Sequence, residues 1–293
     1  MTSFAFIGFG EAGGLLAEGL VGAGAKVTAA YDILIDNPAK VPALTAKADK
    51  IGVTVAKSAR DAIQGAELII AAVTCSDSPA AAESVAMAIG PGQTYLDINS
   101  TSPMVKQENA KIIEAAGGAY VDVAVMDLVP PHGHKVPMLL AGKTAVSVLP
   151  LLTQYGMNAQ AIGEAVGVAS TIKMVRSVFL KGFSAILIES LVAASKVGAH
   201  EKVLDSLQVT FPQIDWHEMA DYYATRLIKH AKRQASEMHE VSDTLEFLGV
   251  EPFTAMATAM RLEWVADLNL QDSAQVPIDC ASFLRAVNAE AAS

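Results

Sequence analysis

The feature that most constrains this chain is a glycine pattern close to its start. The six residues that follow the apolar run 4–7 have the spacing Gly-x-Gly-x-x-Gly, and they are Gly8, Phe9, Gly10, Glu11, Ala12 and Gly13. In a strand–turn–helix unit, the first glycine permits the tight turn, the second lets the backbone approach a pyrophosphate, and the third lets the helix pack close to the strand. The first N–H groups of that helix then point at the phosphates. Because glycine is common, the surroundings of the pattern decide whether it marks a dinucleotide site.

The residues around this pattern are typical of a dinucleotide-binding unit. A second apolar stretch, 26–31, ends at Asp32, whose carboxylate can accept hydrogen bonds from the adenosine ribose and would repel a 2′-phosphate. We therefore predict that residues 8–13 and Asp32 bind NAD. Lys40 and Lys47 follow within reach of a 2′-phosphate, so NADP stays open. The alternative is a glycine-rich turn that binds nothing, with Asp32 in a solvated loop.

Composition and charge limit the class of protein. The chain has 293 residues, of which 52% are hydrophobic and 18% charged, so it can bury a large core in one large domain or two ordinary ones. The formal net charge of −10 argues against nucleic acid or an anionic membrane surface as a partner. The most apolar helical stretch, 178–194, is interrupted by Lys181 and Glu189 and is a poor membrane span.

The cysteines and the N-terminus predict a cytoplasmic protein. Cys75 and Cys280 lie far apart and have no metal-ligand spacing, which suits a reducing cytosol and excludes a disulfide scaffold. The chain enters an apolar run at once, without a basic region or a cleavage site, so we expect no signal peptide. His132 and His134 could suggest a metal pair, but no third ligand lies near them in the sequence, and we expect no metal.

The order of apolar and amphipathic segments predicts two domains. Runs typical of β-strands occur at 4–7, 26–31, 67–73, 94–98, 119–125 and 137–141. Helices or Gly/Pro turns between them predict an α/β fold, a Rossmann-type doubly wound parallel sheet with right-handed crossovers. Amphipathic stretches typical of helices follow at 166–197, 200–211, 215–248 and 252–267. We expect a dinucleotide-binding domain over 1–162, joined by a long helix to an all-helical substrate and dimerisation domain over 163–293.

Two polar segments are candidates for chemistry. Asn99, Ser100 and Thr101 follow a predicted strand, where ligands of open α/β sheets bind, and offer several donors and acceptors in a row. The alternative is a Ser/Thr cap for the following helix. Lys173 lies in an otherwise apolar part of a helix, with Arg176 and Ser177 on neighbouring faces. Burial lowers the pKa of a lysine toward the range useful for proton transfer, whereas a lysine on a helix surface is the commoner case.

The order and spacing of these segments resemble the β-hydroxyacid dehydrogenase superfamily, which includes 3-hydroxyisobutyrate and 6-phosphogluconate dehydrogenases. Residues 8–13 resemble its cofactor fingerprint, 97–103 its Asp-x-Ser-Thr-x-x-Pro segment, and 167–177 its Gly-x-x-x-Lys-x-x-Asn-Asn helix. Segments 129–137 and 173–182 are similar to a poorly characterised branch with its own type of C-terminal helical domain.

The resemblance implies an NAD(P)-dependent oxidoreductase that transfers hydride between a nicotinamide and a small 3-hydroxy acid or its carbonyl form. It implies that Lys173 is the general acid/base and that the chain forms a homodimer through its helices. Asn99, Ser100 and Thr101 would orient the substrate. The loop of Val73, Thr74 and Cys75 would lie under the nicotinamide half of the cofactor.

The substrate segment departs from the family pattern. The family's Asp-Ala-Pro-Val-Ser-Gly-Gly corresponds here to 122–128, so Met126 and Asp127 stand at positions that contact substrate. Ser177 replaces a substrate-binding asparagine, and Arg176 would pair with a substrate carboxylate or form a structural ion pair. Two other functions stay open, an imine or carbonyl reductase and a dinucleotide-binding protein without turnover.

Overall fold

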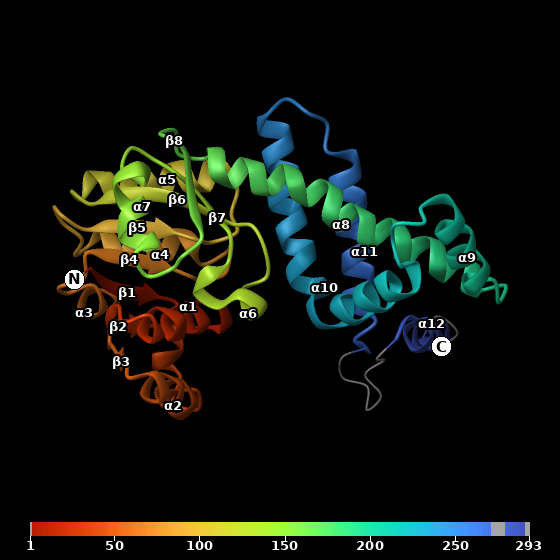
Figure 1. Ribbon diagram of the computed structural model, residues 1–293, viewed down its shortest axis with the longest axis horizontal. Helices are drawn as coiled ribbons and strands as arrows, with labels where there is room; N and C mark the ends of the chain where they lie inside the picture. Colours follow the sequence, from red (N-terminus) through yellow and green to blue (C-terminus); the bar gives the residue numbers. More distant parts are fainter. Residues whose placement is uncertain (1, 271–278, 291–293) are drawn as a thin grey trace. The chain divides into compact units, whose positions relative to one another are not determined.

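An eight-stranded sheet is the framework of the first part of the chain, with strand order β3-β2-β1-β4-β5-β6-β7-β8 (Figure 1). The computed structural model describes residues 2–270 and 279–290. The strands are β1 (Ser3–Ile7), β2 (Lys26–Tyr31), β3 (Thr54–Val55), β4 (Leu68–Ala71), β5 (Thr94–Asp97), β6 (Ala119–Val125), β7 (Met138–Ala141) and β8 (Ala159–Gly163). Since β1 pairs with both β2 and β4, the strand order reverses beside β1, which is where open α/β sheets bind ligands.

Helices cover both faces of this sheet (Figure 1). They are α1 (Glu11–Gly22), α2 (Val41–Ile51), α3 (Ala59–Ala62), α4 (Ser78–Ala86), α5 (Pro103–Ala115), α6 (Val129–His132) and α7 (Ala145–Thr153), with 3₁₀ turns η1 (Ile33–Asp36) and η2 (Gly133–Lys135). Successive side chains of a strand point to opposite faces. In β1, Phe4 and Phe6 therefore join the core under α1, α2 and α7, whereas Ala5 and Ile7 join the core under α3, α4 and α5.

The predicted doubly wound α/β sheet is confirmed, with one difference in strand direction. β7 runs antiparallel to β6, while the other neighbouring strands are parallel. A parallel connection needs a crossover that returns to the starting edge of the sheet. The segment between β6 and β7 instead forms the short α6 and η2, which lie against α1, so the chain enters β7 from the opposite edge.

The described residues after β8 form helices and the short turns between them. The helices are α8 (Val168–Ser195), α9 (His200–Thr210), α10 (Trp216–Phe247), α11 (Phe253–Asp267) and α12 (Cys280–Glu290). The chain divides into two compact units after Lys173, inside α8. By length and composition α8 could cross a membrane, but it contributes Leu187, Ile188 and Leu191 to the buried core of the second unit.

Candidate cofactor and active site

The glycine-rich turn between β1 and α1 uses its three glycines in two different ways. Gly8 has φ +91°, and a Cβ on it would overlap the carbonyl oxygen of Ala72. A Cβ on Gly13 would overlap the carbonyl oxygen of Gly8. Gly10, in contrast, has no atom within 4 Å of the place where a Cβ would stand. Gly8 and Gly13 are thus required by the fold, and the space beside Gly10 fits a pyrophosphate that approaches the backbone.

Asp32 braces this turn from the end of β2. Its Oδ2 accepts a hydrogen bond from the Phe9 N–H at 2.7 Å, and its Oδ1 accepts one from the Leu34 N–H at 3.0 Å. The side chain therefore caps η1 and fixes the turn at the same time. Because each carboxylate oxygen has a second lone pair, Asp32 can still accept hydrogen bonds from ribose hydroxyls.

Lys47 of α2 lies on the same turn. Its Nζ donates hydrogen bonds to the carbonyl oxygens of Phe9 at 2.9 Å and Gly10 at 2.5 Å, and it lies 5.0 Å from the centre of the Phe9 ring. Burial lowers the pKa of the Lys47 ammonium, while the nearby Asp32 acts in the opposite direction. These hydrogen bonds show that Lys47 holds the turn in place. From the sequence, Lys47 was considered only as a residue within reach of a 2′-phosphate.

Asn99 joins the loops that follow β4 and β5. Its Oδ1 accepts a hydrogen bond from the Val73 N–H at 2.7 Å, and its Nδ2 donates to the Ser78 hydroxyl at 3.2 Å. The structure thus brings the predicted nicotinamide loop, Val73 to Cys75, next to the Asn99–Thr101 segment. The side chain of Thr101 is fully buried, and its hydroxyl has no hydrogen-bond partner within the described part of the chain.

Lys173 and Ser100 meet although 73 positions separate them in the chain. The Lys173 Nζ donates a hydrogen bond to the Ser100 hydroxyl at 2.6 Å, and both residues belong to the first unit. The two candidate segments for chemistry therefore form one polar site at the carboxyl edge of the sheet. Arg176 and Ser177 belong to the second unit, and their contact with a substrate stays a prediction.

Met126 and Asp127 follow β6 at this same edge. Met126 packs against a small cluster that includes Ala169 of α8. Asp127 accepts a hydrogen bond from the Leu128 N–H at 2.7 Å, and its Oδ2 lies 3.2 Å from His132 Nε2. The Asp127 carboxylate is therefore directed toward its own loop.

His134 has a different environment from His132. It is buried, with Nε2 3.0 Å from the Tyr155 carbonyl oxygen, and its ring stands where a Cβ of Gly19 would lie. These contacts make His134 a packing residue between α1 and its loop. In residues 2–270 and 279–290, no group of three or more His, Cys, Asp or Glu side chains could hold a metal ion.

A buried charged cluster under the site was missed by sequence reasoning. Lys106 Nζ donates to the Asp97 carbonyl oxygen at 2.6 Å and to Asp97 Oδ1 at 2.8 Å, and it lies 3.7 Å from Asp122 Oδ1. The three side chains have no exposed surface. The available signal was Asp122, an acidic residue in the middle of an otherwise apolar strand segment.

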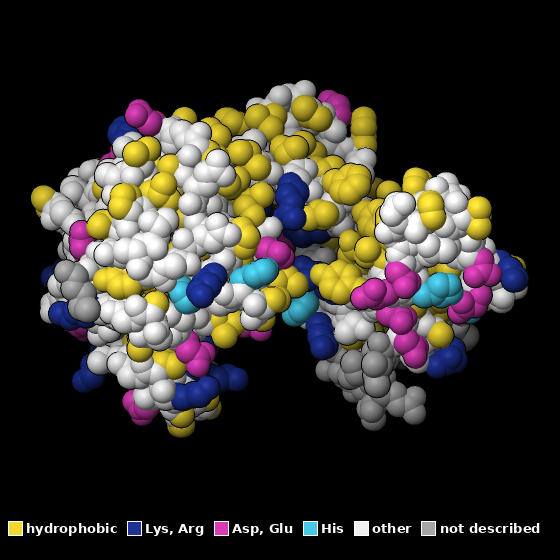
Figure 2. Space-filling model, viewed as in Figure 1, with side chains coloured by type: hydrophobic (Ala, Val, Ile, Leu, Met, Phe, Trp, Pro, Cys, Tyr) yellow, Lys and Arg dark blue, Asp and Glu magenta, His cyan; other side chains and the backbone are white. Residues whose placement is uncertain are grey.

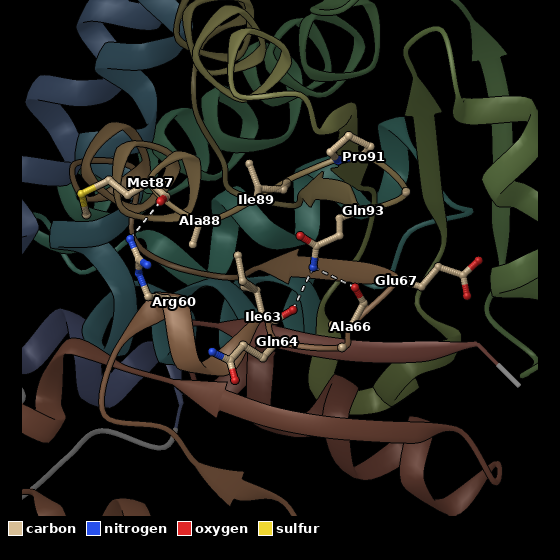
Figure 3. Close-up of a pocket in the computed structure, with 12 residues that line it drawn as sticks. Arg60, Ile63, Gln64, Ala66, Glu67, Met87, Ala88, Ile89, Pro91 and Gln93 are labelled. Carbon is tan, nitrogen blue, oxygen red and sulfur yellow. Dashed lines mark hydrogen bonds between the residues drawn. The ribbon is translucent and has the colours of Figure 1, made fainter.

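A groove of about 780 Å³ lies at the opposite edge of the sheet, beside the starts of β4 and β5 (Figure 3). Two of its polar side chains, Arg60 and Gln93, are paired with its own backbone. Arg60 donates to the Met87 carbonyl oxygen at 3.2 Å, and Gln93 donates to the carbonyl oxygens of Ile63 and Ala66 at 2.8 and 2.9 Å. Ligands of open α/β sheets bind at the carboxyl ends of the strands, so this groove is separate from the candidate site.

Comparisons with known proteins agree with this architecture. Residues 3–101 match the family model described as NADP oxidoreductase coenzyme F420-dependent, and residues 194–265 match a domain of unknown function, DUF1932. A 3-hydroxyisobutyrate dehydrogenase of Mycobacterium tuberculosis, solved with L-serine, has the same fold at 19% identity, with a TM-score of 0.71 over 98% of this chain and 99% of that one.

Three relatives are closer in sequence. A conserved hypothetical protein from Sinorhizobium meliloti 1021 is 37% identical, with a TM-score of 0.77 over 99% of this chain and 97% of that chain. The 28.5 kDa protein in the 7S RNA 5′ region of Methanothermus fervidus is 30% identical over 72% of this chain and 80% of its own length. A further conserved protein, 30% identical with a TM-score of 0.71 over 93% of this chain and all of its own, is described as structurally similar to 3-hydroxyacid dehydrogenases. The chain therefore belongs to the family of these proteins, a branch of the β-hydroxyacid dehydrogenase superfamily.

Proposed function

We propose that this protein is a dehydrogenase that transfers hydride between NAD and a small 3-hydroxy acid, with Lys173 as the general acid/base. The observation that carries the proposal is the hydrogen bond of 2.6 Å between Lys173 Nζ and the Ser100 hydroxyl. A helical lysine alone does not indicate catalysis. The contact with Ser100, however, puts Lys173 at the carboxyl edge of the sheet, where ligands of open α/β sheets bind.

Residues of the first unit have different roles in the proposed reaction. A bound nicotinamide would accept the hydride from the carbinol carbon or return it. Lys173 takes the hydroxyl proton of the substrate in oxidation and returns it to the carbonyl oxygen in reduction. Ser100 holds the lysine at hydrogen-bond distance and offers its own hydroxyl to the substrate oxygen. Asn99 fixes the loop that carries Val73, so the two loops keep a constant spacing.

Asp32 supports NAD as the preferred cofactor. Its carboxylate is held in place by the Phe9 and Leu34 N–H groups, so it cannot easily turn away from a ligand. A fixed negative charge at the end of β2 repels a 2′-phosphate and accepts hydrogen bonds from ribose hydroxyls. The Lys47 ammonium partly offsets the charge of Asp32 and therefore weakens the preference for NAD over NADP.

The decisive experiment is a panel of small 3-hydroxy acids, and of imines in the reverse direction, with NAD and NADP, followed by the absorbance of the reduced nicotinamide. Turnover of a 3-hydroxy acid that Lys173→Ala abolishes, with NAD affinity nearly unchanged, supports the proposal. Cofactor binding without turnover of any acid would refute it, as would turnover of imines alone. An equal loss of turnover and of cofactor affinity in Lys173→Ala would make the lysine structural.

We expect a homodimer that uses the helical unit. Large apolar side chains are exposed on α8 and α11 and contribute to the hydrophobic surface of this unit (Figure 2). They include Phe179, Ile186, Phe253, Met256 and Met260. Contiguous exposed apolar surface is characteristic of protein interfaces. A sedimentation velocity run that finds a monomer at micromolar concentration would contradict this expectation.

A further inference from the structure

The buried charged cluster lies between the two loops of the site and the start of α8. Asp97 and Asp122 are register neighbours on the parallel strands β5 and β6, so their carboxylates point to the same face of the sheet. Two buried carboxylates side by side repel each other strongly unless a cation separates them. Lys106, in the first turn of α5, supplies that cation from 2.8 Å and 3.7 Å.

The two oxygens of Asp122 serve different elements. Oδ1 faces the Lys106 ammonium, whereas Oδ2 accepts hydrogen bonds from the Gly167 N–H at 3.0 Å, the Ser170 N–H at 3.0 Å and the Ser170 hydroxyl at 3.1 Å. These donors lie at the beginning of α8, where an α-helix has N–H groups without partners inside the helix. Asp122 is therefore a charged cap for α8, supplied by a strand 45 positions earlier.

The start of α8 is also fixed to α5. Gly167 has φ +102°, and a Cβ on it would come within 3.1 Å of Pro103 Cβ. The Gln107 amide donates to the Val166 carbonyl oxygen at 3.3 Å. Lys173 follows Ser170 by three residues, so the two lie on neighbouring positions of one helix face. Anchoring the first turn therefore sets the direction from which Lys173 reaches Ser100.

We propose that Lys106, Asp97 and Asp122 are positioning residues that hold Lys173 against Ser100. Asp97 fixes the Ser100 side of the pair, because it also accepts a hydrogen bond from the Asn99 N–H at 3.0 Å. Asp122 fixes the Lys173 side through the first turn of α8. Lys106 joins the two carboxylates and makes their close approach stable. The inference rests on the proposed role of Lys173, but the arrangement can be tested without turnover.

The sharpest variant is Asp122→Asn. An asparagine is neutral and has one acceptor and one donor end. Asp122 Oδ1 forms an ion pair with the Lys106 ammonium at 3.7 Å without a hydrogen bond, whereas Oδ2 accepts from the α8 N–H groups. In either orientation the amide NH2 group faces another donor. The variant therefore loses either the contact with Lys106 or the hydrogen bonds to the start of α8, while the side-chain shape and the Asp97–Lys106 ion pair are kept. Lys106→Met is a second variant, and Lys111→Met is its control, because Lys111 lies on the same helix in an exposed ion pair with Glu108.

Two measurements decide the proposal in variants that keep the wild-type circular dichroism spectrum. The first is the acylation rate of Lys173, read by peptide mass spectrometry on the whole protein. We expect at least a threefold change in Asp122→Asn and none in Lys111→Met. The second is steady-state turnover, where we expect kcat to fall at least tenfold in Asp122→Asn while KM and the Kd of NAD stay within twofold.

An unchanged acylation rate at Lys173 in folded Asp122→Asn would overturn the proposal, whatever the effect on thermal stability. A fall in NAD affinity parallel to kcat would also overturn it, since it would show a general loss of structure. If the wild-type protein turns over no hydroxy acid, the proposed function fails, but the acylation rate still reports whether the cluster positions Lys173. Should Lys106→Met not fold, the Asp122→Asn result alone decides.

Discussion

Replacement of the glycines at 10 and 13 by alanine separates cofactor binding from folding. A methyl group on Gly10 enters space with no atom within 4 Å, and the residue has the extended backbone conformation that alanine also adopts, with φ −65°. Gly→Ala at a compatible position stabilises a protein by about 0.4–1 kcal/mol, because it restricts the unfolded chain. We therefore expect the unfolding free energy of Gly10→Ala to stay equal to that of the wild type or to rise by up to about 1 kcal/mol.

The same methyl group stands where a pyrophosphate must approach the backbone. If it displaces the phosphates so that one hydrogen bond to a charged group is lost, the loss is about 1.5–3 kcal/mol. This corresponds to a roughly 10- to 150-fold weaker Kd for NAD. In Gly13→Ala the methyl group instead overlaps the carbonyl oxygen of Gly8, which belongs to the backbone and cannot move aside. Overpacking of this kind costs about 1–3 kcal/mol, and we expect a lower Tm before any cofactor is added.

The assay combines thermal unfolding by circular dichroism without cofactor and calorimetric titration with NAD. Gly22→Ala is the matched control, because Gly22 ends α1 with nothing within 4 Å of its Cβ position, and it should leave the Kd unchanged. Wild-type NAD affinity in a stable Gly10→Ala protein would refute the reasoning, because the pyrophosphate would then not pass over residue 10. A fall in Tm for Gly10→Ala comparable to that of Gly13→Ala would refute the structural half of the argument.

Four further predictions concern side chains near the turn and the two cysteines. Asp32→Asn keeps the shape of the cap but removes its charge, so the ratio of NADP to NAD affinity should rise at least tenfold, and an unchanged ratio would remove Asp32 from the ribose site. Lys47→Met removes two hydrogen bonds to the turn and should lower the affinity for NAD and NADP alike. Lys50→Met is the control, because Lys50 forms only an exposed ion pair with Glu18, and it should leave both affinities unchanged. A selective loss of NADP affinity in Lys47→Met would place Lys47 at the 2′-phosphate. Iodoacetamide at pH 8 should modify Cys75, with protection by NAD, and spare Cys280, because burial raises the pKa of the Cys280 thiol from 9.0 to about 12. Between these pH values the folded chain keeps the Cys280 proton that the unfolded chain releases. The unfolding free energy should therefore fall as pH rises from about 9 toward 12, by at most about 1.4 kcal/mol per pH unit. Urea titrations should find this decline smaller in Cys280→Ala.

The strands that the sequence predicts well are those with apolar side chains on both faces. The apolar runs at 4–7 and 119–125 became β1 and β6 almost residue for residue, because a sheet covered on both sides demands continuous apolar strands. β3, with two residues at the edge of the sheet, and β8, with no fully buried side chain, lack that signal. The direction of β7 was not predictable from its own residues, since it is set by the path of the preceding loop.

The site shows a similar division. The glycine spacing and Asp32 were readable because their chemistry depends on local sequence distances. The family resemblance implied that Lys173 and Ser100 serve the same substrate, but their direct contact was not predicted, since no local rule joins residues 73 positions apart. Lys106 left no usable signal, because a lysine in the first turn of a helix is ordinarily a solvated residue. Its burial follows from the register of two strands, which a single sequence does not specify.

The start of α8 is fixed to the sheet of the first unit. The glycine-rich turn and Ser100 both lie at the carboxyl ends of parallel strands, and therefore at one edge of one sheet. Through Asp122, the first turn of α8 is joined to this sheet as well, so this anchor of the helix that carries Lys173 lies within the first unit. Cofactor binding and proton transfer, as we propose them, then need only the first unit. We propose that Met126 and Asp127 after β6, which depart most from the family pattern within the first unit, select the substrate. If the cofactor turn and the acid/base are fixed on one sheet, as we propose, a change at Met126 or Asp127 would alter the choice of substrate without rebuilding the rest of the site.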